Sequence, residues 1–347
     1  MQSPIQTAGS AASAAVWESI RRFLPGYGVC CLPCWLFVSA QDSLPIFCCG
    51  FLFHARRRPD QPGRDKKSGE FRAKGRSCLL KIKIENLALE TIRPGKIRYT
   101  YPLLFIHGAG GTSQYWKNYL PYFADKGWEV FAVNLRGHFP SDREEALAQV
   151  TLENYLEDVE KVIRRLDIGA CAVIGHSLGG LIAQKTAENI DSVKALITLA
   201  GAPPLGVALE VNNDLPYSGT IMKTMWGMMN MRPVKPTFMM AEKTVLNNID
   251  PGEQKAVFDM FVAESLAVGY QVAQGVLVNP SRIKCPRLVI GCAKDMLAPA
   301  SMQKNIADFL QADYIEYQQF AHLPMLEKGW EKSAGDLAKW LRDRVEV

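Results

Sequence analysis

A chain of 347 residues, of which 48% are hydrophobic and 22% charged, can bury one large hydrophobic core or two smaller ones. The formal net charge of +5 is local, because residues 1–76 hold eleven Lys and Arg against five acids, which leaves −1 for residues 77–347. A folded part so near neutral speaks against nucleic acid or another polyanion as a partner.

Residues 1–76 differ in character from the rest of the chain. The stretch 23–54 is apolar but broken by prolines, so it lacks the roughly 20 unbroken apolar residues that a transmembrane helix needs. The stretch 55–76 is a basic linker of a composition typical of disorder. We expect residues 1–76 to be an N-terminal extension with no part in catalysis, and residues 77–347 to form the folded domain. Weak association of 23–54 with a membrane is the alternative.

The nine cysteines fall into two groups. Five lie in the apolar N-terminal stretch, where Cys31 and Cys34 have the spacing of a redox or metal pair. No second pair with a histidine accompanies them, so we expect no metal site. The other cysteines stand singly in or beside predicted strands, as reduced core cysteines do. They favour a cytoplasmic protein; membrane association or export through residues 23–54 is the alternative.

After the linker, apolar strands alternate with amphipathic helices. The segment 152–166 shows the helical pattern most clearly, because Thr151 can cap it and its apolar residues share one face. Such alternation predicts an α/β protein with a mostly parallel sheet covered by helices on both faces. Ligands of such sheets bind at the carboxyl ends of the strands. The sequence predicts strands at 80–84, 96–99, 103–106, 130–133, 170–174, 193–199, 286–291 and 314–317, and further helices at 115–125, 181–187, 301–310 and 331–345.

Residues 202–285 interrupt this alternation. No strand is evident there, and methionines crowd around aromatic side chains. We expect a mostly helical cap inserted before the strand at 286–291. Methionine adapts to irregular apolar surfaces, so the cap is a candidate wall for a lipophilic site; an ordinary small core is the alternative interpretation. The cap residues that we expect in a substrate pocket are Met225, Trp226 and Met229.

The most informative motif is Gly175-His176-Ser177-Leu178-Gly179, which stands between an apolar strand and a helical segment. This strand–turn–helix context is the one that a nucleophile elbow requires. The glycines leave room for a strained turn, and the turn exposes the serine hydroxyl at the edge of the sheet. We therefore expect Ser177 to be a nucleophile.

A serine nucleophile needs a base and an acid. Of the five histidines, His322 follows the last predicted strand and is the best candidate base. His138 is the runner-up, whereas His176 lies beside the nucleophile, where its ring cannot easily turn back onto Ser177. Asp295 leaves the preceding strand on a short loop and is the candidate acid.

The reaction also needs backbone N–H groups that bind an oxyanion. We expect them from Leu178, directly after the nucleophile, and from Ala109 in a glycine-rich loop, with Gly110 as the alternative to Ala109. His107 and Gly108 open this loop and would support it. The loop lacks the residues of a phosphate cradle or of a dinucleotide fingerprint.

Residues 79–347 resemble the α/β-hydrolase superfamily, in its capped, serine esterase or lipase-like branch. The order Ser, Asp, His along the chain matches that family. The resemblance implies an eight-stranded, mostly parallel sheet and no cofactor, and the serine speaks against the branches that use aspartate as nucleophile, the dehalogenases and epoxide hydrolases. One departure is Phe139-Pro140-Ser141, where the family usually has Gly-x-Ser. We expect Phe139 and His176 to line the substrate pocket.

The expected activity is hydrolysis of a small to medium lipophilic carboxylic ester through an acyl-enzyme intermediate. Ser177 would attack the carbonyl, His322 would move the proton, and Asp295 would orient His322. Two alternatives stay open. The same residues would serve thioester, C–C bond or perhydrolase chemistry, or the fold would bind a ligand without hydrolysing it. The sequence leaves the oligomeric state open.

Overall fold

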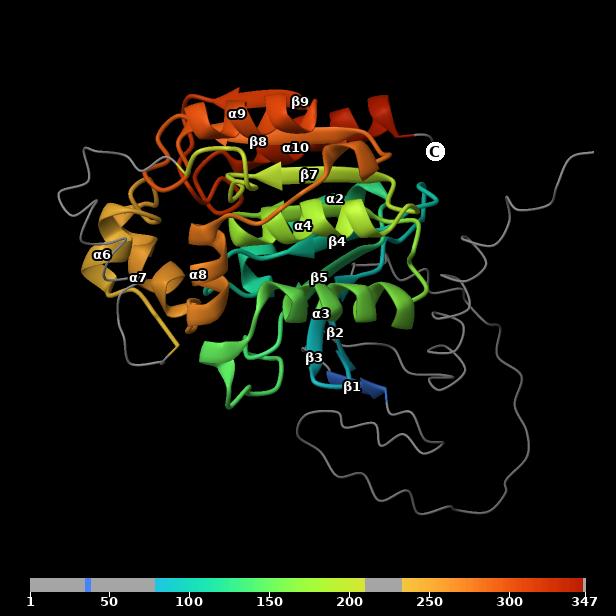
Figure 1. The fold of residues 1–347 in the computed structure, drawn as a ribbon. Helices are drawn as coiled ribbons and strands as arrows, with labels where there is room; N and C mark the ends of the chain where they lie inside the picture. The colour runs from blue at the N-terminus through green and yellow to red at the C-terminus, as the bar shows by residue number, and fades with distance from the viewer. Residues whose placement is uncertain (1–34, 39–78, 210–232, 346–347) are drawn as a thin grey trace, which may run out of the picture.

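The computed structural model describes residues 35–38, 79–209 and 233–345, which form one nine-stranded sheet with helices around it (Figure 1). The strands are β1 (Trp35–Val38), β2 (Leu79–Ile84), β3 (Leu87–Ile92), β4 (Leu103–Ile106), β5 (Val130–Asn134), β6 (Ala172–His176), β7 (Ala195–Leu199), β8 (Arg287–Cys292) and β9 (Asp313–Tyr317). Their order across the sheet is β1-β2-β3-β5-β4-β6-β7-β8-β9. All neighbours are parallel except the pairs β2–β3 and β3–β5. The predicted α/β class with a mostly parallel sheet is confirmed.

The central strands are buried on both faces, because helices cover each face. In β4, Leu104 and Ile106 join one hydrophobic cluster, whereas Leu103 and Phe105 join the other. This period of two is the geometry of an extended strand. The helices on the first face are α3 (Leu152–Arg165), α4 (Leu178–Asn189) and α9 (Ala300–Leu310), and those on the second are α2 (Tyr119–Lys126) and α10 (Trp330–Arg344) (Figure 1).

Strand β3 replaces the strand that the sequence predicted at 96–99. The chain turns back directly after Ile84 through Glu85 and Asn86, and Glu85 has a left-handed backbone with a φ of 54°. β3 is buried along its whole length and pairs with both β2 and β5. Residues 96–99 form no strand, and Ile97 is 41% exposed. Burial between two strands therefore outweighs the short alternating pattern at 96–99.

The sheet has one strand more than the family resemblance implied, and that strand lies within the N-terminal extension. β1 runs parallel to β2, with Trp35 opposite Lys81. Without β1, the outer edge of β2 would present unpaired backbone N–H and C=O groups. The rest of the extension lies outside the described residues, and with it the prediction of weak membrane association through 23–54. No helix among residues 79–209 and 233–345 has the length and apolar composition needed to cross a bilayer.

The chain between β7 and β8 forms the predicted helical cap. Its described helices are α6 (Phe238–Lys243), α7 (Pro251–Asp259) and α8 (Leu266–Gln274). They lie at the end of the sheet toward which β7 points, so the cap stands over the carboxyl ends of the parallel strands (Figure 1). A short antiparallel bridge joins Val234 to Glu264 within the cap. Three expected pocket residues belong to 210–232 and lie outside the described residues: Met225, Trp226 and Met229.

Candidate active site

Ser177 lies at the sharp turn between β6 and α4. Its backbone has a φ of 51° and a ψ of −119°, and such a conformation costs an L-residue about 1–3 kcal/mol. The flanking glycines make the turn feasible. A Cβ on Gly175 would lie 2.0 Å from the Gly179 carbonyl oxygen, and a Cβ on Gly179 would lie 2.4 Å from that of His107. The turn holds the half-buried serine at the N-terminus of α4, where the helix dipole favours negative charge.

The glycine-rich loop after β4 lies against this turn. A Cβ on Gly108 would lie 2.7 Å from Nδ1 of His176 and 2.8 Å from Cβ of Ser177, so glycine is required for such a close approach. His107 braces the loop, because its Nδ1–H donates to the Gly108 carbonyl (2.9 Å) and its Nε2 accepts from the Leu135 N–H (3.2 Å). Burial lowers the pKa of His107 to about 3, so the ring is neutral. The support expected from His107 and Gly108 thus has a geometric basis.

Asp295 and His322 meet on the loops that follow β8 and β9. Nδ1 of His322 is 2.8 Å from Oδ2 of Asp295, and both side chains are almost fully buried. The other carboxylate oxygen, Oδ1, accepts from the N–H groups of Leu297 (2.8 Å) and Ala298 (2.9 Å). These bonds fix the carboxylate, which in turn holds the His322 proton on Nδ1. Nε2 then carries a lone pair, the form in which an imidazole accepts a proton from a hydroxyl.

Glu327 braces the loop that carries His322. Its Oε2 accepts from the Ala321 N–H (2.8 Å) and its Oε1 accepts from the Leu323 N–H (3.0 Å), so one carboxyl group binds the amides on both sides of His322. Burial raises the pKa of Glu327. Sequence reasoning missed this brace. The only signal in the sequence is an acidic residue placed directly after four apolar ones.

His176 links the serine turn to the His322 loop. Its Nε2–H donates to the His322 carbonyl oxygen (2.8 Å), while its buried Nδ1 has no hydrogen-bond partner among the residues that the structure describes. Burial, followed by the neighbouring His322, lowers the pKa of His176 well below its ordinary value. The ring is therefore neutral and held in place. It lines the cavity described next, as expected of a pocket residue.

One cavity of about 230 Å³ brings these elements together. Ser177 and His322 line it, and so do Ala109 and Leu178. Neither Lys nor Arg occurs among the described residues of its wall, and the described part of the chain holds no cluster of His, Cys, Asp or Glu side chains suited to a metal ion. The apolar cap residues of the wall are Val234, Pro236, Met240, Val245, Phe261, Leu266, Val268 and Val272.

Two backbone amides at this cavity are available to an oxyanion. The N–H groups of Ala109 and Leu178 make no hydrogen bond within residues 79–209 and 233–345, and both residues line the cavity. The N–H of Gly110, in contrast, donates to Oε2 of Glu264 (2.9 Å). Gly110 is therefore not the alternative donor that the sequence suggested. The reason is a carboxylate 154 residues further along the chain, which local sequence patterns do not place.

Phe139 does not line this cavity, contrary to the expectation from sequence. Its side chain is 70% exposed. The loop is held instead by Ser141, whose hydroxyl donates to the Asn134 carbonyl (2.6 Å) and accepts from the Ala88 N–H (2.8 Å). With Ser141 bonded to two strands, Phe139 is left on the surface. The departure from the family pattern here affects the outer loop and not the cavity.

His138, the runner-up base, belongs to a different network and does not line the cavity. Its Nε2 is 3.2 Å from Oε2 of Glu264, and its Nδ1 is 3.1 Å from the Arg136 carbonyl oxygen. Burial alone would lower the pKa of His138, but Glu264 outweighs it and raises this pKa. Burial alone would raise the pKa of Glu264, but His138, together with hydrogen bonds, lowers it to about 2. The two side chains form a buried ion pair.

We expect His138→Gln to reduce the free energy of unfolding by about 3–5 kcal/mol, because it leaves the Glu264 carboxylate buried without its cation. The raised pKa of His138 means that its contribution is complete below 6.5 and is lost as the pH rises. The lowered pKa of Glu264 means that its contribution is complete above 4.5 and is lost as the pH falls toward 2. The loss of free energy of unfolding in His138→Gln should therefore be largest between pH 4.5 and pH 6.5. Urea unfolding of the wild type and of His138→Gln, near pH 5.5 and near pH 9, measures this loss. An equal loss at the two pH values would contradict the ion pair.

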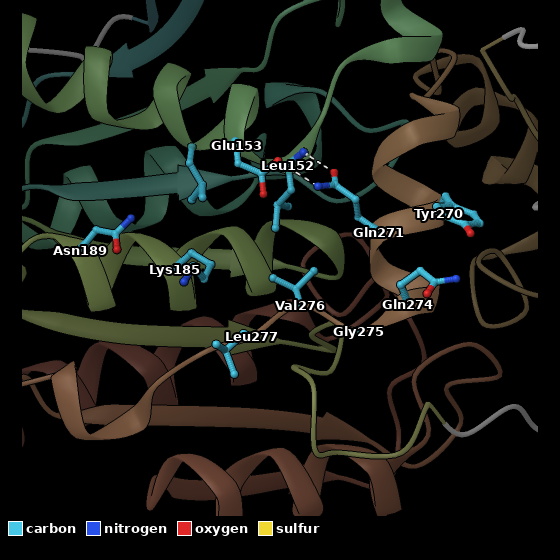
Figure 2. Close-up of a pocket in the computed structure, with 11 residues that line it drawn as sticks. Leu152, Glu153, Lys185, Asn189, Tyr270, Gln271, Gln274, Gly275, Val276 and Leu277 are labelled. Atoms are coloured by element: carbon cyan, nitrogen blue, oxygen red, sulfur yellow. Dashed lines mark hydrogen bonds between the residues drawn. The ribbon is translucent and has the colours of Figure 1, made fainter.

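A second pocket, of about 520 Å³, lies on the surface beside α3, α4 and the end of α8 (Figure 2). It shares no lining residue with the first cavity, and neither serine nor histidine lines it. In Figure 2, Gln271 of α8 reaches to α3, where it accepts from the Leu152 N–H (2.7 Å) and donates to Glu153 (2.9 Å). This contact holds the cap on the core, away from the serine.

Comparison with known proteins agrees with this arrangement. The family described as alpha/beta hydrolase fold matches residues 101–229, which include the glycine-rich loop and the serine turn. Protein ABHD8 of Bos taurus is 24% identical over 227 residues, which cover 65% of this chain and 52% of that protein, so the match spans about half of the relative. Epoxide hydrolase 3 of Mus musculus is 21% identical over 303 residues, or 80% of this chain and 77% of that protein.

The solved structure of a thermophilic esterase from Thermogutta terrifontis superposes with a TM-score of 0.58 at 21% identity, covering 74% of this chain and 93% of that one. This likeness supports the fold. Relatives named as hydrolases also support an enzyme. The sheet order, the serine turn and the family match together show that this chain has the alpha/beta hydrolase fold.

Proposed function

We propose that this chain is a serine hydrolase that cleaves small to medium lipophilic carboxylic esters through an acyl-enzyme intermediate. The observation that carries the proposal is the 2.8 Å contact between His322 and Asp295 beside a cavity that Ser177 also lines. The left-handed backbone of the serine supports it, because a strained residue at a cavity marks a functional position. The esterase among the structural neighbours points the same way.

In the proposed reaction, Oγ of Ser177 attacks the ester carbonyl carbon while Nε2 of His322 takes the hydroxyl proton. Asp295 keeps the imidazole oriented and stabilises its charged form. The amides of Ala109 and Leu178 bind the oxyanion that develops on the carbonyl oxygen. His322 then gives its proton to the departing alcohol. Water, deprotonated by the same imidazole, attacks the acyl-serine and releases the acid.

The cavity wall supports a neutral, lipophilic substrate of modest size. The cavity has a volume of about 230 Å³. The cap contributes mostly apolar side chains, and the described wall holds no cation that would pair with an anionic acyl group. Burying an unpaired carboxylate costs several kcal/mol. A charged acyl chain should therefore react far more slowly than a neutral one of similar length.

A matched pair of esters tests this proposal. We expect p-nitrophenyl butyrate to be hydrolysed with a kcat/KM at least about 100-fold higher than that of p-nitrophenyl hemisuccinate, which has a similar length but ends in a carboxylate. A series from acetate to palmitate should reach its maximum at short or medium chains. Equal rates for the butyrate and the hemisuccinate would contradict the proposed substrate class, and no hydrolysis of any ester in the series would contradict the proposed function.

A further inference from the structure

The Glu264 carboxylate stands between the cap and three elements of the core. It lies on the cap segment between α7 and α8, and its side chain is only 13% exposed. Oε2 accepts from the Gly110 N–H (2.9 Å) and contacts Nε2 of His138 (3.2 Å). Oε1 accepts from the Tyr155 hydroxyl (2.6 Å) and the Ser265 N–H (2.6 Å). Four donors thus converge on two buried oxygens.

Glu264 is a carboxylate and His138 is its cation. Nδ1 of His138 faces the Arg136 carbonyl, which can only accept a hydrogen bond, and Nε2 faces the Glu264 oxygen. Although burial opposes both shifts, the pKa of Glu264 is lowered to about 2 and that of His138 is raised, so the proton resides on the ring and both ring nitrogens donate. The adjacent His107 is neutral and 4.8 Å away between ring centroids, so it adds no competing charge.

Gly110 is held by the cap on both of its backbone groups. Its N–H donates to Glu264, and its carbonyl accepts from the Val262 N–H (2.8 Å). The residue has a φ of 62°, and a Cβ there would lie 2.9 Å from the Val262 carbonyl oxygen, so glycine is required. Ala109, the expected oxyanion donor, directly precedes Gly110 in the chain. Its orientation therefore depends on how the cap holds Gly110.

We propose that Glu264 is a positioning residue, which fixes the Ala109 amide by holding Gly110 and so makes oxyanion binding depend on the seated cap. This inference rests on the function proposed above. Two consequences follow from the geometry. Glu264 removes the Gly110 N–H from the set of donors, and the ion pair with His138 supplies the binding energy that keeps the carboxylate in place. Glu264 also lines the cavity, but this positioning role requires no contact with the ester.

The variant that tests the inference is Glu264→Gln. The amide keeps the shape of the side chain but replaces one acceptor oxygen with a donor, which then faces an N–H or the imidazolium. We expect kcat for p-nitrophenyl butyrate to fall by about 10- to 100-fold with KM changed by less than about threefold, because only the oxyanion loses stabilisation. Affinity for an alkyl trifluoromethyl ketone, which forms a tetrahedral oxyanion on the serine, should fall by the same factor as kcat/KM. Affinity for an alkanol of the same chain length as the ketone, which forms no oxyanion, should stay unchanged.

Glu153→Gln is the matched control. Glu153 also joins the cap to the core, through the 2.9 Å bond from Gln271, but it contacts neither the glycine-rich loop nor the cavity. We expect wild-type kcat and ketone affinity for this variant. Should Glu264→Gln not fold, Glu264→Asp serves instead, because it keeps the charge but is one methylene too short to bind Gly110 and Tyr155 together. Its kcat and ketone affinity should then fall together by about tenfold.

The outcomes separate the inference from the proposed function. A wild-type enzyme that neither cleaves esters nor binds the ketone overturns the proposed function. An active wild type with a Glu264→Gln variant of unchanged kcat and ketone affinity overturns the role of Glu264. The same holds if ketone and alkanol affinities fall equally, because that result means a general loss of pocket structure.

Discussion

Ser177→Ala is expected to lower kcat for p-nitrophenyl butyrate by about 10⁴-fold or more while the protein stays folded. The proposed mechanism has no other nucleophile, and the attacking hydroxyl is held on a strained turn at the N-terminus of α4. Alanine lacks only the hydroxyl of serine and fits the same space at the turn, so the free energy of unfolding should change little. Initial rates and thermal unfolding of the purified variant measure both quantities.

Ser192→Ala is the control for this substitution. Ser192 is exposed, precedes β7 and donates its hydroxyl to the Gly169 carbonyl, and neither residue belongs to the described cavity wall. Its activity should equal that of the wild type. Ester hydrolysis near the wild-type rate in Ser177→Ala would assign the nucleophile to another residue.

His322→Ala should cost about as much as the loss of Ser177, because the three residues act as one unit. Asp295→Asn should cost somewhat less. An asparagine that donates to Nδ1 of His322 would shift the imidazole proton to Nε2, and that tautomer cannot accept the serine proton. Steady-state rates on the same ester check both expectations.

Asp142→Asn is the matched control for the acid, since Asp142 is exposed and pairs with Lys83 on the surface. It should retain full activity. Activity that survives in His322→Ala but disappears in His138→Ala would mean that the base had been assigned to the wrong histidine. If Asp142→Asn lost as much activity as Asp295→Asn, the assignment of Asp295 as the acid would be contradicted.

Local patterns were sufficient for those parts of the fold whose residues carry their own signal. The motif around Ser177 predicts a strand, a turn and a helix, because its glycines leave room for a sharp turn between the other two elements. The structure has β6 and α4 at these positions. The loops of Asp295 and His322 follow apolar strands, so the rule that parallel strands present ligands at their carboxyl ends brings them to the same edge. The 2.8 Å contact between the two side chains accords with that rule.

The features that sequence reasoning missed depend on contacts between distant segments. The strand β3 is specified by its pairing with β2 on one side and β5 on the other. Its own sequence shows a weaker strand pattern than residues 96–99 do. β1 joins the sheet from a segment separated from β2 by about 40 residues of basic and apolar chain. Glu264 reaches Gly110 across 154 positions. A single sequence read locally contains no sign of such partners.

At Phe139 the departure from the family pattern leaves the cavity unchanged, because this side chain is on the surface. The residue follows β5 at the edge of the sheet where ligands bind, so a pocket position was a reasonable expectation. Which of two neighbouring side chains turns inward is decided by hydrogen bonds to Asn134 and Ala88, and these select Ser141. The position of Phe139 after β5 therefore predicts the edge of the sheet at which it lies, but not the direction in which its side chain points.

The most direct test of the central claim is covalent labelling with an alkyl fluorophosphonate, followed by mass spectrometry of the intact protein and of its peptides. An activated serine reacts quickly with this reagent, and an ordinary hydroxyl does not. We predict a single adduct on the wild-type protein, located on Ser177, and none on Ser177→Ala under the same conditions. An unlabelled wild type, or an adduct that persists in Ser177→Ala, would contradict the account of this chain as a serine hydrolase.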